Sequence, residues 1–298
     1  MTGVASRRIG WRVAPEGFTP EKLLDGDSSQ GHEAADVRQW LRLAKADVLF
    51  EASSLNAVTG QPAIDHIRAA LEAGAHAVSA NKGPVVYAWR ELTKLAAAKG
   101  RRFLHESAMM DGVPIFSLFR ETLPAIEIRG FRGVLNSTTT VILDAMAAGM
   151  SFDDAVREAQ RLGVAETDPS SDVDGTDAAV KVVGLTTVLM DGSLKLDDVR
   201  RQGIRNIGPQ QLREALVGGE VWRLVSRAQR TRDGTILASV APERLMAGDP
   251  LSTVRGTSLL ICFETDIFPE LIIGERDPGP QATAYGLLAD FLTAIRST

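Results

Sequence analysis

The sequence has very little cysteine, and this sets the first limits on its class. Among 298 residues there is a single cysteine, Cys262, which stands inside the apolar run SLLICFE. One thiol cannot form a disulfide framework, so we do not expect a disulfide-stabilised secreted domain. We interpret Cys262 as a buried core thiol and expect a protein of the reducing cytoplasm.

Long apolar runs and basic clusters are also missing. No apolar stretch approaches the roughly 20 residues that cross a bilayer. The first residues, MTGVASRRIGWRVAPEG, lack the apolar centre of a secretory signal. The net charge is −5 and no block of Lys or Arg occurs. We therefore expect no association with a membrane or with nucleic acid.

What is present is ordinary globular composition, with 44% hydrophobic and 24% charged residues. In the first third, short apolar strands such as ADVLFEASS and HAVSA alternate with helical stretches at 60–73 and 84–99. This alternation predicts an α/β sheet with right-handed crossovers. Before it, TGVASRR is expected to end a strand, followed by a loop to about Gly31 and a helix over 33–44.

The character changes after Gly112-Val113-Pro114. Strand-like runs now dominate and suggest an antiparallel sheet that is open to a second subunit: AIEIRGFRGVLNST, VWRLVSRAQ, GTILASVAP, SLLICFETD and ELIIGE. Helices are expected at 118–123, 139–148, 151–162 and 283–295. We predict two domains, one over 1–112 that is completed by the C-terminal segment 279–298, and one over 113–278.

Charged side chains that could act in a site are most concentrated in the stretch GVAETDPSSDVDGTDAAVK, which ends at Lys181. Asp177 and Lys181 are four residues apart on a helix expected to begin at Gly175, so they share one face. The apolar run that continues to Met190 predicts a buried helix. A carboxylate and an ammonium at its start are costly unless paired or used, which suits a small cationic substrate and a proton transfer. A plain helix-surface ion pair is the alternative.

A calcium site is the other interpretation of this stretch. Four residues fit the first half of an EF-hand loop: Ser170, Asp172, Asp174 and Gly175. Such a loop requires a bidentate Glu at its twelfth position, and that position is Lys181. The cation excludes the calcium interpretation.

Polar side chains also follow the expected strands. Ser53 and Ser54 come after ADVLFEA, and Asn81-Lys82 come after HAVSA, at the sheet edge where ligands bind in open α/β sheets. Arg7 and Arg8, at the end of the first strand, could meet a ribose 2′-phosphate. The alternative for Lys82 is a solvated loop charge, and the alternative for Arg7 and Arg8 is a solvated basic pair near the terminus.

Two further segments carry candidates, one at the end of the first predicted domain and one in the second. Glu106 could bind a cation together with backbone carbonyls of the turn that follows, or could be a structural carboxylate. Asn136-Ser137-Thr138-Thr139 lies between a strand and a helix. It is either a simple N-cap or a site for a substrate carboxylate at the helix N-terminus.

Together, SANKGP, GVLNSTT and GVAETDPSSDVDGTDAAVK resemble homoserine dehydrogenase in order and spacing. The similarity runs from about residue 3 to the C-terminus, and the length resembles forms without a C-terminal regulatory domain. It implies an α/β fold, with an N-terminally truncated Rossmann-like dinucleotide-binding domain and an α+β substrate and dimerisation domain. It also implies NAD(P)-dependent interconversion of L-homoserine and L-aspartate 4-semialdehyde, in threonine, methionine and isoleucine biosynthesis, by a cytoplasmic homodimer.

The resemblance implies roles for individual residues. Lys181 would be the general acid/base at the substrate oxygen, with Lys82 and Asp177 in the catalytic centre. The substrate-binding positions would be Glu166, Asp172, Asp177, Thr138 and Ser137. The positions that bind NAD or NADP would be Arg7, Arg8, Ser53, Ser54, Asn81, Lys82 and Gly279. A sodium site would use Glu106 with carbonyls of Met109, Asp111 and Val113.

The sequence also departs from the family. The usual first strand and its G-x-G-x-x-G loop are missing, so we predict an incomplete version of a longer protein, which the DNA upstream of Met1 would test. Val164 replaces an aromatic residue, Ser137 a Gly and Thr140 an Asn, and DPGPQATAY a more glycine-rich loop. Two rival functions remain open: a homologue without catalysis, and a dehydrogenase for another small amino-acid aldehyde.

Overall fold

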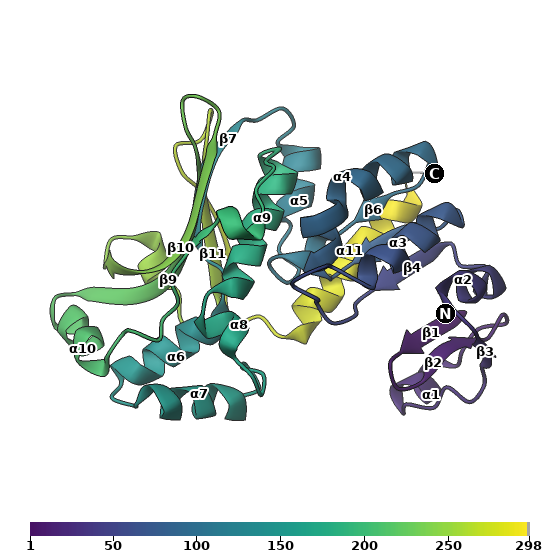
Figure 1. Cartoon of the computed structure of the whole chain (residues 1–298), viewed down its shortest axis with the longest axis horizontal. Coiled ribbons are helices and arrows are strands. Elements are labelled where there is room, and N and C mark those ends of the chain that lie inside the picture. Colours follow the sequence, from purple (N-terminus) through teal and green to yellow (C-terminus); the bar gives the residue numbers. More distant parts are fainter. Residues whose placement is uncertain (297–298) are drawn as a thin grey trace. The chain divides into compact units, whose positions relative to one another are not determined.

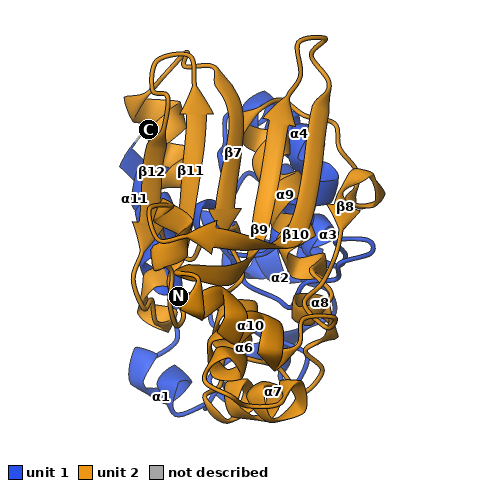
Figure 2. Ribbon diagram, turned by 90° about the vertical axis from the view of Figure 1, so that its left-hand side faces the viewer, with its two compact units in different colours: residues 1–108, 283–298 blue, residues 109–282 orange. Residues whose placement is uncertain are grey.

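The computed structural model describes residues 1–296. The chain divides into two compact units, which we describe separately. The first unit holds Met1–Ala108 and the C-terminal segment that starts at Thr283, and the second holds Met109–Ala282 (Figures 1 and 2). Among the described residues, no helix is long and apolar enough to cross a membrane.

The first unit contains two three-stranded sheets. The antiparallel sheet has the order β1-β2-β3, and the parallel sheet has the order β4-β5-β6. The strands are β1 (Gly3–Ser6), β2 (Gly10–Val13), β3 (His32–Ala34), β4 (Val48–Glu51), β5 (His76–Ser79) and β6 (Phe103–Leu104). The helices are α1 (Pro20–Leu24), α2 (Val37–Ala44), α3 (Ala63–Glu72), α4 (Lys82–Ala98), the 3-10 turn η1 (Glu106–Ala108) and α11 (Pro280–Arg296).

The parallel sheet is covered on both faces, as its apolar strands require. On one face, the Glu51 carboxylate of β4 lies 3.5 Å from His66 Nδ1 of α3. On the other face, Phe50 stacks on Phe291 of α11 at 5.7 Å between ring centroids. Helix α2 joins the two sheets, since its Trp40 packs among Val13, Leu49 and their neighbours in one buried cluster. A side chain at Gly3 would collide with the Trp40 ring, so β1 needs glycine there.

The second unit is built on a six-stranded sheet of order β12-β11-β7-β9-β10-β8, which Figure 2 views face-on. Its strands are β7 (Ile128–Val134), β8 (Arg200–Arg201), β9 (Glu220–Arg230), β10 (Ile236–Met246), β11 (Leu259–Thr265) and β12 (Leu271–Glu275). All neighbours are antiparallel except β8 and β10. Its helical elements are α5 (Ile115–Ser117), η2 (Leu118–Thr122), α6 (Ser137–Ala147), α7 (Phe152–Arg161), α8 (Ser170–Val173), α9 (Thr176–Leu189), η3 (Leu196–Asp198), α10 (Pro209–Val217) and η4 (Pro250–Thr253).

The buried helix predicted after Gly175 is confirmed as α9, which packs on β9 and β10 behind the sheet in Figure 2. Val180 and Leu185 are fully buried, and burial of each such side chain stabilises the fold by about 1.5–3 kcal/mol. Gly175 has φ +78, and a side chain there would approach Val240, so glycine is needed where α9 begins. Cys262 is buried, as predicted.

Several local predictions are wrong. The loop expected up to Gly31 contains strand β2 and helix α1, and residues 32–34 form β3 rather than the start of a helix. Each strand of the β1–β2 hairpin has four residues, and so short a run shows too little alternation to indicate a strand. Helix α2 begins after Asp36, whose side chain accepts the N–H of Gln39 at 2.8 Å. The acidic loop contains the one-turn helix α8.

Candidate functional site

Helix N-termini in the second unit bring the predicted residues Asp172, Asp177 and Lys181 together. Helix α9 carries Asp177 and Lys181 in its first two turns, and the short helix α8 before it carries Asp172. Helix α6 starts directly after the turn that leaves β7, and Asn136 is its N-cap. The turn and the two helices therefore place one amide, two carboxylates and one ammonium in a single neighbourhood.

Lys181 is held by two partners. Its Nζ lies 3.4 Å from Asp177 Oδ2 and donates a hydrogen bond to the carbonyl oxygen of Leu135. The side chains of Lys181 and Asp177 are only 12% and 15% exposed. The predicted i,i+4 pair therefore exists, and it lies in a largely buried place where an ion pair interacts more strongly than on the surface.

Asn136 links the two carboxylates of this cluster. Its Nδ2 lies 2.6 Å from Asp172 Oδ1 and 3.1 Å from Asp177 Oδ2. Burial raises the pKa of Asp172, and the charge of Asp177 raises it further, while Asn136 and Lys181 act in the opposite direction. The cluster thus contains one carboxyl that gains a proton more readily than an ordinary aspartate.

The remaining substrate-binding candidates differ in their surroundings. Thr138 is buried, and its hydroxyl donates to the carbonyl oxygen of Val164 at 3.0 Å. Ser137 is half-buried in the first turn of α6. Glu166 is exposed. Its main-chain carbonyl oxygen accepts a hydrogen bond from Gln160 Nε2 at 3.1 Å, and its carboxylate has no hydrogen bond or ion pair within residues 1–296. The structure does not bring the Glu166 carboxylate into the Lys181 cluster.

The other acids of the loop have structural partners. Asp174 pairs with the guanidinium of Arg205, and Asp168 accepts the N–H of Ser170 at 3.0 Å. Both are on the exposed side of the loop, as expected for residues that shape it. Within the described residues there is no group of three or more His, Cys, Asp or Glu side chains arranged for a metal ion.

The predicted cofactor residues lie in the first unit, where three loops meet. Arg7 Nη2 donates to Ser54 Oγ at 3.1 Å, which joins the loops that follow β1 and β4. Asn81 Nδ2 donates to the carbonyl oxygen of Ser53 at 2.9 Å, which joins the loops after β4 and β5. Lys82 occupies the first position of α4, and Asn81 caps that helix. Arg7 follows a strand of the antiparallel sheet, and the serines and Asn81 follow strands of the parallel sheet. Guanidinium, hydroxyl and amide groups of this kind fit the ribose and phosphate oxygens of a dinucleotide.

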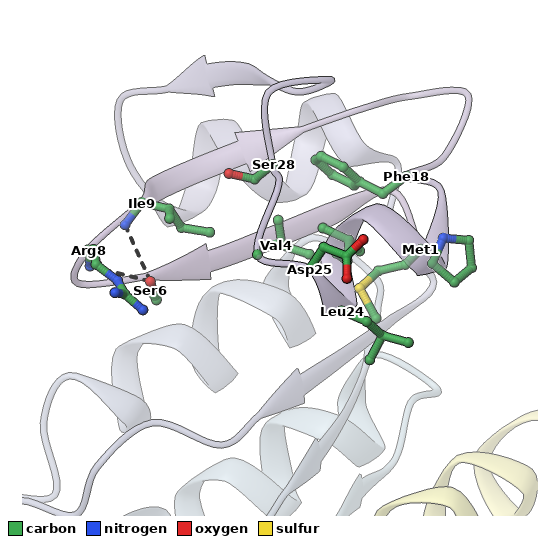
Figure 3. A pocket seen from close by; sticks show the side chains of 12 residues that line it. Met1, Val4, Ser6, Arg8, Ile9, Phe18, Leu24, Asp25 and Ser28 are labelled. Carbon is green, nitrogen blue, oxygen red and sulfur yellow. Dashed lines mark hydrogen bonds between the residues drawn. The ribbon is translucent and has the colours of Figure 1, made fainter.

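Arg8 and Gly279 stand apart from this group. Arg8 lines a pocket of about 860 Å³ whose other walls are largely apolar, including Val4, Phe18 and Leu24 (Figure 3). The main-chain N–H groups of Arg8 and its neighbour both donate to Ser6 Oγ, as Figure 3 shows. Gly279 belongs to the second unit and directly precedes α11.

The four residues proposed for sodium are divided between the units. Glu106 is buried in the first unit, and its N–H donates to Asp290 Oδ2 of α11 at 2.7 Å. Met109, Asp111 and Val113 begin the second unit, and Asp111 has a left-handed φ of 45°. The donor set is one carboxylate and three carbonyls, all hard oxygen ligands, and this chemistry fits a hard cation.

A family model supplies the decisive comparison. The model described as homoserine dehydrogenase matches residues 114–292, more than half of the chain. The chain belongs to the homoserine dehydrogenase family. The matched region contains the whole Lys181 cluster, so the geometry and the family assignment refer to the same residues.

Individual relatives agree with this homoserine dehydrogenase assignment. The chain is 36% identical to the NAD(+)-dependent homoserine dehydrogenase of Pseudomonas canavaninivorans, over 83% of this chain and 70% of that one. It is 37% identical to the homoserine dehydrogenase of Methanocaldococcus jannaschii, over 90% of this chain and 78% of that one. A hyperthermophilic archaeal homoserine dehydrogenase in complex with NADPH superposes with a TM-score of 0.83 at 28% identity, over 99% of this chain and 88% of that one.

The sequence did not reveal one titratable residue that interacts with the Lys181 cluster. Glu275, at the end of β12, is half-buried and interacts with the side chain of Asp111. Burial, together with Asp111, raises the pKa of Glu275 to about 8, against the weaker effect of Lys181. The available signal was an acid at the end of the apolar strand ELIIGE, just before the loop that departs from the family.

Proposed function

We propose that this chain interconverts L-homoserine and L-aspartate 4-semialdehyde with NAD or NADP, as a step of threonine, methionine and isoleucine biosynthesis. The observation that carries the proposal is the cluster of Lys181, Asp177 and Asp172, with its ammonium 3.4 Å from one carboxylate. The family assignment, the NAD(+)-dependent relative and the NADPH-bound neighbour support the reaction class.

Lys181 is proposed as the general acid/base. Oxidation of homoserine removes a proton from the hydroxyl while the carbinol carbon loses hydride, so a base must stand within about 3 Å of that oxygen. Lys181 is the only amine of the cluster in the described part of the chain, and its partners hold it in one direction. The nicotinamide, when bound, supplies the hydride chemistry.

Substrate recognition follows from charge. Homoserine carries an ammonium and a carboxylate, and we assign Glu166 and Asp177 to its ammonium and hydroxyl ends, with Asp172 in support. Ser137 and Thr138 lie in the first turn of α6, where N–H groups and the helix dipole favour a carboxylate. The exposed position of Glu166 leaves its carboxylate available to a ligand.

Cofactor binding is assigned to residues of the first unit and to Gly279. Arg7, Ser53, Ser54, Asn81 and Lys82 would hold ribose, phosphate and nicotinamide groups, and Arg8 would stand beside them. The printed sequence contains no G-x-G-x-x-G loop, so these residues do not supply the usual backbone donors for the pyrophosphate. The absence of this loop from the sequence is the reason to consider the rival function, an amino-acid-binding homologue without catalysis.

One assay separates these functions. The chain is mixed with NADPH or NADH and aspartate 4-semialdehyde, and cofactor oxidation is followed together with homoserine formation. Turnover supports the proposal, and turnover only with another small amino-acid aldehyde would favour the second rival, to which Val164 points. Homoserine binding without any turnover would favour the non-catalytic homologue.

We also propose a cytoplasmic homodimer formed through the open face of the six-stranded sheet. This face carries ion pairs of both signs, Arg132 with Asp249 and Arg227 with Glu243, beside the exposed Ile272. Adjacent positive and negative groups suit a face that meets its own copy. Sedimentation equilibrium should give twice the chain mass of 32.0 kDa, and a concentration-independent monomer would contradict it.

A sodium ion bound by Glu106 and the carbonyls of Met109, Asp111 and Val113 is proposed on donor chemistry alone. Bound cation stabilises the folded state by mass action. The melting temperature should therefore rise when sodium chloride replaces choline chloride at equal ionic strength. No difference between the two salts would count against the site.

A further inference from the structure

The hydrogen bonds of the turn that contains Asn136 fix the orientation of its side-chain amide. It is 3% exposed and caps α6, because its Oδ1 accepts the main-chain N–H of Thr139 at 2.9 Å. A main-chain N–H can only donate, so the oxygen of the amide must face the helix. The NH₂ group is therefore directed to the other side, toward the acidic cluster.

Two carboxylates share this NH₂ group. Nδ2 lies 2.6 Å from Asp172 Oδ1 and 3.1 Å from Asp177 Oδ2. An amide nitrogen has two N–H donors, one for each carboxylate. Without it, two largely buried acids would face each other directly, and like charges at short range repel strongly where water is scarce.

The same turn also holds the lysine. Leu135, the residue before Asn136, accepts the hydrogen bond of Lys181 Nζ through its carbonyl oxygen, and Lys181 lies 3.4 Å from Asp177. Adjacent residues of one turn therefore fix the ammonium and its acidic neighbours. This turn is rigid because Thr139 and Thr140 also donate their hydroxyls to the carbonyl oxygen of Asn136.

We propose that Asn136 is a positioning residue of the active site, whose amide holds the Asp172 and Asp177 carboxylates in place beside Lys181. The inference rests on the proposed function, in which Lys181 transfers the proton and Asp177 contacts substrate. Asn136 does not touch the reacting atoms. It determines where the carboxylates stand when the substrate arrives, and it keeps them apart.

A purely structural role as an N-cap is the competing explanation, and two substitutions separate the roles. Asn136→Ser and Asn136→Asp both keep an oxygen that can accept the Thr139 N–H, since Ser and Asp are good N-caps. Both remove the NH₂ donor, and Asn136→Asp adds a third carboxylate. Ser151→Ala is the matched control, because Ser151 caps the neighbouring helix α7 and has no contact with the cluster.

The kinetic test measures kcat, KM and melting temperature for each variant. We expect Asn136→Ser to lose about 10–100-fold in kcat, the size typical when a group that orients a functional residue is removed. KM for the cofactor should stay within twofold, and the melting temperature should fall no more than that of Ser151→Ala. Asn136→Asp should lose more kcat than Asn136→Ser. Wild-type kcat in Asn136→Ser would overturn the proposal.

A second measurement does not depend on turnover. The side-chain amide signals of Asn136 are assigned by NMR in the full chain and then followed in Asp172→Asn and Asp177→Asn. Each substitution should shift these signals, and each should leave the main-chain N–H of Thr139 bound to its cap. Unshifted side-chain signals would overturn the proposal. If the wild-type chain shows no turnover, the proposed function fails, and this measurement alone decides the role of Asn136.

Discussion

Lys181 Nζ lies 3.4 Å from Asp177 Oδ2, one helical turn away on α9, and both side chains are largely buried. Pairs of this spacing on exposed helices stabilise by only about 0.2–0.5 kcal/mol. Here the helix is apolar on almost every side, and the pair is also connected to the turn that leaves β7. A surface ion pair would not need the carbonyl of Leu135 or the amide of Asn136, and the arrangement supports the active site that we propose.

Lys181→Ala is expected to abolish most of the turnover. Loss of a general acid/base costs about 10²–10⁴-fold in kcat, and the cofactor residues of the first unit are unchanged. Cofactor affinity, measured by fluorescence titration, should stay within twofold. Lys94→Ala, which removes an exposed lysine of α4, is the control and should retain full kcat. Equal loss of turnover and cofactor affinity in Lys181→Ala would contradict the proton-transfer role.

Glu166→Gln is expected to weaken homoserine binding. A charge-assisted hydrogen bond between a carboxylate and an ammonium contributes about 1.5–3 kcal/mol, so KM for homoserine should rise roughly 10- to 150-fold. Asp168→Asn is the matched control, because Asp168 is also exposed, stands two residues later and accepts the N–H of Ser170 within the same loop. If both variants raise KM alike, the loss comes from the loop and not from contact with the ammonium.

Much of the fold could be predicted from periodicity. The buried helix α9 and the second-unit strands other than the two-residue β8 follow from long apolar or alternating runs, which are the strongest local signals. The hairpin of β1 and β2 could not be read, because each strand has four residues. Its stability comes from Trp40 of α2, which donates Nε1–H to the carbonyl oxygen of Arg12 at 2.9 Å, a tertiary contact that no local pattern predicts.

The site was partly predictable for a similar reason. The Asp177–Lys181 pair follows from helical spacing, since four residues make one turn. The contact between Asn136 and Asp172 joins positions 36 residues apart, and it depends on how α6 and α8 pack. Glu275 and Asp111 are still more distant in sequence, and their proximity required the complete sheet. Contacts between residues so far apart in sequence can be identified only from the folded structure.

Stability should decrease with rising pH because of Glu275. Its folded pKa is about 8 and its ordinary value is 4.5, so between these values the folded chain keeps a proton that the unfolded chain has lost. The contribution of this proton to the free energy of unfolding is fully present below pH 4.5, and it is lost as the pH rises toward 8. Asp111 and Lys181 are the charged groups that face it.

Urea unfolding at about pH 5 and about pH 8.5 measures this effect. Glu275→Gln keeps a neutral side chain at every pH, so the decrease in stability between the two values should become smaller. Glu264→Gln, an exposed acid of β11, is the control and should show the wild-type decrease. An unchanged pH dependence in Glu275→Gln would show that the carboxyl group is ionised in the folded chain.

The ion pair between Arg223 of β9 and Asp144 of α6 should be the most costly to break. Arg223 is 2% exposed, and its Nη2 lies 2.8 Å from Asp144 Oδ1. Burial lowers the pKa of this guanidinium, and the charge of Asp144 acts in the opposite direction. Within residues 1–296, Asp144→Ala leaves the guanidinium hydrogen-bonded to the carbonyls of Trp222 and Val254. Removal of one partner of a buried pair costs about 3–5 kcal/mol.

Glu158→Ala in α7 isolates the effect of burying the arginine. The side chains of Glu158 and Asp144 are 29% and 33% exposed, so the two acids are closely matched. Their partners differ, because Arg161 is 69% exposed whereas Arg223 is 2% exposed. Glu158→Ala should cost at most about 1 kcal/mol in urea unfolding, since water replaces the lost contact. Similar losses in both variants would mean that solvent reaches Arg223 in the folded chain.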